Sequence, residues 1–157
     1  MGKARIGDHM RRFRLPLVPT RIRWGTVIAV AGIILYYSIQ AGPGTQTFQT
    51  GPLGLFPYSD WLHFLAYACL AVMLAYALHD SRLSEWQVFL FVFVCAVGYG
   101  VTIELLQSRL PSRTFAVGDM GVNAVGAAVA VLCWRGLVRY VRFYQAARPA
   151  DLEPPVT

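Results

Sequence analysis

The chain has 157 residues, enough for one domain, and 56% of them are hydrophobic, with a mean hydropathy of +0.48. Only 14% are charged, well below the roughly 25% of a typical soluble domain, which excludes an ordinary soluble fold and places most of the chain against lipid. The net charge of +6 comes from basic residues near the two ends rather than from a patch interleaved with aromatics, so we expect no nucleic-acid partner.

Residues 1–21 form a basic leader that contains Pro16 and Pro19, and we expect it to be irregular. The run Arg11-Arg12-Phe13 is only weakly similar to a twin-arginine signal. The apolar stretch that follows is long and no small-residue cleavage site ends it, which favours a retained signal anchor over a cleaved signal peptide.

Four apolar segments are predicted to be helices, at residues 22–40, 60–78, 86–107 and 119–138. Each approaches the ~20 residues that cross a bilayer, and no alternating strand pattern competes. The first connection, 41–58, is rich in Gly, Pro, Thr and Gln, and Ser59 is the expected N-cap of the second helix. A charged turn at 79–85 and a loop at 108–118 complete the chain of connections.

Lysine and arginine positions predict the orientation of these spans. Most of them flank the start of the first span and the end of the fourth, whereas the loops 41–58 and 108–118 contain only Arg109 and Arg113. Because cytoplasmic segments are enriched in Lys and Arg, both termini are expected in the cytoplasm. We therefore expect an all-α integral membrane bundle of about four transmembrane helices, multi-pass in the cell membrane. Its transmembrane domain would cover 22–138, between the cytoplasmic leader 1–21 and a basic, then Pro-rich cytoplasmic tail at 139–157.

Titratable side chains gather at the end of the bundle that this topology turns outward. Asp60, His63 and Tyr67 fall within roughly 60° of arc on one helix. Glu104 and Gln107 lie one turn apart near the end of the third predicted helix, and Asp119 and Asn123 lie one turn apart at the start of the fourth. A central charge costs roughly 2.5–3.5 kcal/mol in a membrane, so several of them together predict a functional pocket. The predicted pocket residues are Asp60, His63, Tyr67, Glu104, Gln107, Arg113, Asp119 and Asn123.

Glu104 is the member of this set that folding alone explains least. It lies near a predicted helix C-terminus, where the dipole disfavours a carboxylate, and burial disfavours the charge further. It is therefore the best candidate for a group that binds and releases a proton, and Glu104, His63 and Asp60 are the catalytic candidates if the protein is an enzyme. Taken singly, Gln107 and Asn123 also fit the role of interhelical hydrogen-bonding residues, worth ~0.6 kcal/mol on average.

The three cysteines, Cys69, Cys95 and Cys133, lie in apolar runs without the spacing of a zinc site. We expect them to be small buried hydrophobes.

The polar motifs resemble the VanZ-like family of small integral membrane proteins. They follow the family's pattern in order: Asp-x-x-His-x-x-x-Tyr, Glu-x-x-Gln, an Arg in the loop, and Asp-x-x-x-Asn-x-x-Gly. The matching blocks are Ser59–Tyr67 with Leu70, Glu104–Gln107, Arg113-Thr114 and Gly118–Gly126. The resemblance covers roughly residues 58–130 and implies a compact bundle of about four membrane helices. The family takes its name from a determinant of low-level resistance to a glycopeptide antibiotic, and the resemblance implies no defined reaction.

Three functions compete for the polar pocket. In the favoured one it binds a lipid-linked or anionic cell-envelope ligand, with Arg109 and Arg113 meeting an anionic headgroup. In the second, Asp60, His63, Glu104 and Asp119 hold a divalent metal or act as acid and base on a lipid headgroup. No cofactor is predicted, although the second alternative is compatible with a divalent metal. The third is a small transporter, against which the acidic groups leave no polar path through the bilayer centre.

Overall fold

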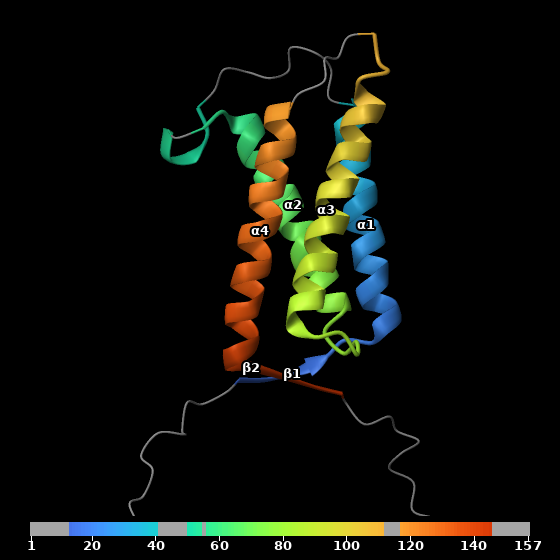
Figure 1. Ribbon diagram of the computed structural model, residues 1–157, viewed down its shortest axis with the longest axis vertical. Coiled ribbons are helices and arrows are strands. Elements are labelled where there is room, and N and C mark those ends of the chain that lie inside the picture. The colour runs from blue at the N-terminus through green and yellow to red at the C-terminus, as the bar shows by residue number, and fades with distance from the viewer. Residues whose placement is uncertain (1–12, 41–49, 55, 112–116, 146–157) are drawn as a thin grey trace, which may run out of the picture.

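A computed structural model describes residues 13–40, 50–54, 56–111 and 117–145. Its four α-helices are α1 Thr20–Gln40, α2 Tyr58–Ala77, α3 Glu85–Gln107 and α4 Val117–Tyr140. All four are long and apolar enough to cross a membrane, and they run side by side as one bundle (Figure 1). The predicted all-α membrane bundle is confirmed, and each helix end agrees with its predicted position within two residues.

The start of α2 differs from the prediction in its cap. The helix begins at Tyr58, and Pro57 stands at the N-cap position with no side-chain hydrogen bond, so the prediction for Ser59 is wrong. Proline fixes φ near the helical value and therefore prepares the chain to enter a helix directly. The next helix has the side-chain cap instead: Ser84 accepts a hydrogen bond from the backbone N–H of Gln87, whose side chain accepts one in return.

Helix α2 packs against all three other helices. The core that they share is made of small and branched apolar side chains, among them Leu70, Ala71, Val92, Ala96 and Ala127. Small residues let helix backbones approach closely where the lipid offers no hydrophobic driving force for association.

Large apolar side chains cover the outside of the bundle, as a helix surface in contact with lipid requires. Ile28, Val94 and Leu132 are examples, one on each of three helices. Cys69 and Cys133 are also exposed on this outer surface and Cys95 is partly exposed, so the prediction that the cysteines are buried is wrong.

Arg23 of α1 is buried, with 1% of its side chain exposed. Its guanidinium donates hydrogen bonds to the carbonyl oxygens of Tyr76 (2.9 Å) and Ala77 (3.1 Å), and to Asp80 Oδ2 at 2.6 Å. The last carbonyls of a helix have no partner within the helix, so Arg23 caps the C-terminus of α2 and ties it to α1. Its hydrogen bond also holds the pKa of Asp80 below its usual range.

Two short strands lie beyond the helices, β1 Phe13–Leu17 and β2 Val141–Gln145. They pair in parallel, with Phe13 opposite Val141 and Leu17 opposite Gln145, at one end of the bundle (Figure 1). The expectation of an irregular leader is therefore wrong for residues 13–17, while residues 1–12 lie outside the described part of the chain. The pairing places the segment before α1 and the segment after α4 at the same end of the bundle.

The sheet is joined to the α2–α3 turn by aromatic contacts. The Phe143 ring lies 4.6 Å from the His79 ring and 5.9 Å from the Trp134 ring, measured between centroids. The backbone N–H of Val18 donates to the hydroxyl of Tyr76 at 3.1 Å. Burial among these rings, followed by the nearby charge of Arg23, lowers the pKa of His79. The two strands that flank the helices, 13–17 and 141–145, are thus packed onto the end of the bundle.

Candidate functional site

The predicted site residues that the structure describes lie at the end of the bundle opposite the sheet. There α2 begins, α3 ends and α4 begins (Figure 1). Three helix segments that are distant in sequence thus bring their polar side chains to one level, as the predicted up-and-down topology requires.

His63 of α2 contacts two oxygen-bearing side chains of α4. Its Nδ1 lies 3.2 Å from Oδ1 of Asn123, and its Nε2 lies 3.7 Å from Oδ2 of Asp119. Asp119 and Asn123 are four residues apart and therefore share one helix face. About a quarter of His63 is exposed (25%), so the imidazole is held between two oxygens but is still reachable from outside. A histidine paired with a carboxylate in this way can move a proton, which is the arrangement that general acid–base chemistry uses.

Tyr67 is one turn after His63 on α2 and is almost fully buried, with 2% exposed. It meets α3 at Gly100: a Cβ at that glycine would lie 3.1 Å from the Tyr67 ring and 3.2 Å from Nδ2 of Asn123. The glycine therefore lets α3 approach the other two helices at the level of the polar cluster. Tyr67 is a core residue of the site rather than an aromatic at the membrane interface.

Glu104 and Gln107 come from the last turns of α3, and each is 5% exposed. Glu104 is four residues after Gly100 and so lies on the face of α3 that meets Tyr67. Gln107 points elsewhere: its Nε2 donates to the carbonyl oxygen of Ser38 in α1 at 2.7 Å. Glu104 therefore lies on the side of α3 that meets Tyr67, whereas Gln107 joins α3 to α1.

Three further residues are candidates for the site: Asp60, Arg109 and Arg113. Asp60 accepts a hydrogen bond from the Ser59 hydroxyl at 3.1 Å. Arg109 is exposed in the turn after α3, and Arg113 lies outside the described residues.

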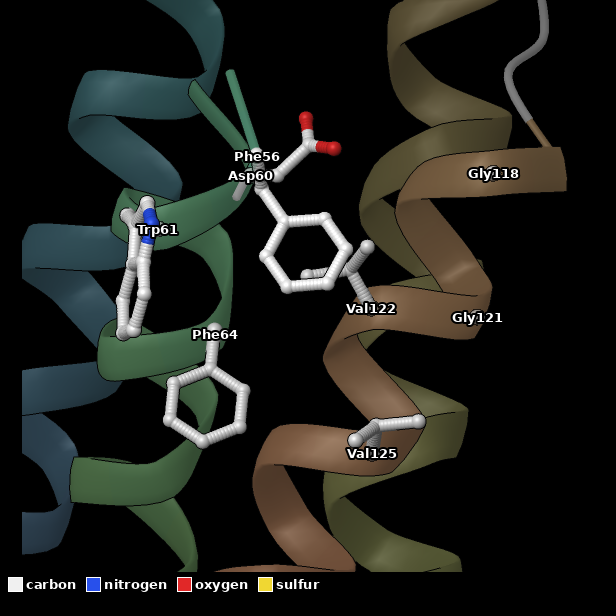
Figure 2. Close-up of a pocket in the computed structure, with 8 residues that line it drawn as sticks. All are labelled: Phe56, Asp60, Trp61, Phe64, Gly118, Gly121, Val122 and Val125. Atoms are coloured by element: carbon white, nitrogen blue, oxygen red, sulfur yellow. The ribbon is translucent and has the colours of Figure 1, made fainter. Parts of the chain in front are cut away.

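An apolar pocket of about 370 Å³ opens between α2 and α4 beside the polar cluster. Figure 2 shows Phe64 of α2 facing Val122 and Val125 of α4, with the Phe56 ring between the helices and the Asp60 carboxylate at one end. Its lining residues are Phe56, Asp60, Trp61, Phe64, Gly118, Gly121, Val122 and Val125. Of the predicted pocket residues that the structure describes, Asp60 alone lines this space, so the arrangement is an apolar pocket next to a polar cluster rather than one polar pocket.

Within the described residues, no three His, Cys, Asp or Glu side chains come together as metal ligands.

Four helices of membrane-spanning length, with a partly buried polar cluster at one end, define a small multi-pass integral membrane protein. A family model described as VanZ/LLP1 matches residues 24–139, and the chain belongs to this family. The match covers α2 and α3 completely and nearly all of α1 and α4, and it confirms the resemblance carried by the polar motifs. No curated protein and no solved structure matches the chain.

Several residues that build the site were not singled out from the sequence for it. Gly100 is one of 14 glycines in the chain, and nothing in the sequence sets it apart. Ser38 acts through its backbone carbonyl, which carries no residue-specific signal. Phe56 and Val125 line the pocket because of the distance between α2 and α4 at this level, which the sequence does not show. The motif glycine Gly126 was the one available signal, because a motif position without a side chain indicates a close approach of backbones.

Proposed function

We propose that this VanZ-like protein resides in the cell membrane and binds an amphiphilic, lipid-linked ligand of the cell envelope at this end of the bundle. The observation that carries the proposal is the adjacency of two environments: an apolar pocket between α2 and α4, and a polar cluster on the same two helices. A lipid-linked ligand needs both, because its chain is apolar and its headgroup is not.

The pocket suits the apolar part of such a ligand. Its volume of about 370 Å³ falls within the roughly 300–1,000 Å³ of small-molecule sites, and a buried methylene contributes ~0.8 kcal/mol. Asp60 lies at one end and is three residues before His63, so a chain in the pocket would place its polar group beside both side chains. Carboxylate and amide oxygens accept hydrogen bonds from hydroxyl or amine groups, and the exposed Arg109 offers a partner for an anionic group.

Filling the pocket tests this directly. Val125→Trp is expected to displace the lipid that co-purifies with the protein, because the indole occupies the space of its chain. The lipid is measured by solvent extraction of the purified protein and mass spectrometry. Val129→Trp is the matched control: Val129 lies one turn farther along α4, is also exposed, and does not line the pocket. An identical lipid complement in wild type, Val125→Trp and Val129→Trp would contradict the proposal.

We further propose that the site faces the extracytoplasmic side, on the basis of the Lys and Arg distribution. The test starts from a variant in which Cys69, Cys95 and Cys133 are alanine. A cysteine replacing Ser108, after α3, is expected to react with an impermeant maleimide in intact cells. A cysteine replacing Ser84, before α3, should react only after lysis. The opposite pattern would place the site in the cytoplasm.

A further inference from the structure

The sheet at the other end of the bundle brings two arginines into register. Arg14 of β1 is the partner of Arg142 in β2, and both are exposed. Partners in a sheet project to the same face, and neighbouring strands are ~4.8 Å apart, so the two guanidinium groups start from adjacent positions. Like charges opposite each other destabilise a strand pair. The charges of Arg14 and Arg142 therefore repel each other, and a bound anion would relieve that repulsion.

No carboxylate within the described residues supplies that anion. The ion pairs of the structure are Arg23 with Asp80, Arg135 with Glu85, and His63 with Asp119, and none involves Arg14 or Arg142. The two charges are thus uncompensated among the residues that the structure describes.

The two faces of the sheet differ in character. Val141 is buried and Phe143 packs on His79 and Trp134, so this face turns toward the bundle. Phe13 and Leu15 share that face by register, yet they are 72% and 48% exposed because the sheet extends past the helices. The opposite face carries Arg14 and Arg142. An apolar face that is partly exposed beyond the helices and a basic face opposite it are typical of elements that lie in the membrane interface.

The position of the two strands in the sequence also indicates that the sheet lies in the membrane interface. β1 ends three residues before α1 begins, and β2 follows α4 directly. Strands that continue from the ends of membrane-spanning helices lie at the level of the lipid headgroups. Tyr140 and Tyr144 are exposed at this level, where tyrosine is enriched in membrane proteins.

We propose that Arg14 and Arg142 form a binding site for the phosphate of an anionic phospholipid in the leaflet at this end of the bundle. The two guanidinium groups bind phosphate oxygens with charge-assisted hydrogen bonds, and the phosphate removes the repulsion between the strands. Phe13 and Leu15 contact the acyl region beneath. The site is independent of the envelope-ligand pocket, which lies at the opposite end.

The experiment measures lipid binding to the full-length protein in detergent by native mass spectrometry. Dioleoyl phosphatidylglycerol is expected to bind more tightly than dioleoyl phosphatidylcholine. Arg14→Gln and Arg142→Gln should each weaken the phosphatidylglycerol affinity by roughly fivefold. Arg82→Gln is the matched control, since Arg82 is exposed at the same end of the bundle but outside the sheet. An equal loss in Arg82→Gln would show general charge attraction and overturn the proposal, as would tight binding of inorganic phosphate alone.

A second measurement separates binding from misfolding. In phosphatidylcholine nanodiscs the double variant Arg14→Gln, Arg142→Gln should melt no lower than wild type, because the substitution relieves repulsion. In phosphatidylglycerol nanodiscs it should melt lower than wild type. A double variant that melts lower by the same amount in both lipids would show a purely structural role and refute the lipid site.

Discussion

Replacing Arg23 with methionine is expected to lower the free energy of unfolding by about 3 kcal/mol, near the lower end for breaking a buried ion pair. The substitution keeps most of the buried side-chain volume but removes every donor. It removes the arginine hydrogen bond from the carbonyl oxygen of Ala77 and from that of Tyr76, which still accepts from the backbone N–H of His79. It also leaves Asp80 without its cation. The lower end applies because Asp80 is 32% exposed and water can partly replace the arginine.

The measurement is reversible unfolding in mixed micelles, followed by tryptophan fluorescence. Arg21→Met is the matched control, because Arg21 lies two residues earlier on α1, is exposed, and loses the same charge. The control should change stability by less than 0.5 kcal/mol, as surface substitutions usually do. A loss of the same size in both variants would mean that Arg23 acts only through net charge and not as the cap of α2.

Replacing Gly126 with valine is expected to force α2 and α4 apart. A Cβ at Gly126 would lie 2.5 Å from the carbonyl oxygen of Phe64, which belongs to the backbone and cannot rotate away. Overpacking of this kind costs about 1–3 kcal/mol. Because Phe64 also lines the pocket, the separation should change ligand binding as well as stability. The two effects together would be seen as a lower unfolding midpoint and an altered lipid complement after purification.

Gly136 offers the control on the same helix. A Cβ there would meet nothing within 4 Å, so Gly136→Val makes the same change in helix propensity without the collision. We expect it to leave the α2–α4 packing unchanged. If both valine variants lost equal stability, the cause would be helix propensity, and the close contact of Gly126 with Phe64 would not contribute to stability.

The four helices could be predicted from the sequence because the bilayer imposes one strong rule. Backbone groups in hydrocarbon need partners within the segment, so each long apolar run must be helical. Helix ends followed from Gly, Pro and charged residues. The cap of α2 was mispredicted because serine and proline both favour that boundary, and only the tertiary structure decides between Ser59 and Pro57.

The convergence of His63, Asp119 and Asn123 was also predictable, since up-and-down helices must bring these positions to one end. What the helix pattern could not provide was the lateral spacing of the helices. That spacing decides that Gln107 bonds to α1, and that Asp60 borders an apolar pocket instead of facing His63 across a polar one. Such outcomes depend on contacts such as Gly126 against Phe64, which a single sequence does not display.

The strands were missed for a different reason. Five residues with a proline among them carry little local preference for an extended structure, and β1 exists only through its partner. An isolated pair of strands is marginal in water, so the pairing depends on the aromatic contacts of Phe143 with the bundle end.

The partnership of β1 with β2 also orders events during synthesis. Translation delivers β1 at the beginning and β2 only after the last helix, so the two cannot meet until the whole bundle has left the ribosome. Until then α1 is held to its neighbours by helix packing and by hydrogen bonds such as those of Arg23 and Gln107. Pairing of the two strands is therefore the final step of assembly. In a nascent chain arrested within α4, β1 would still have no partner strand beside the first helix.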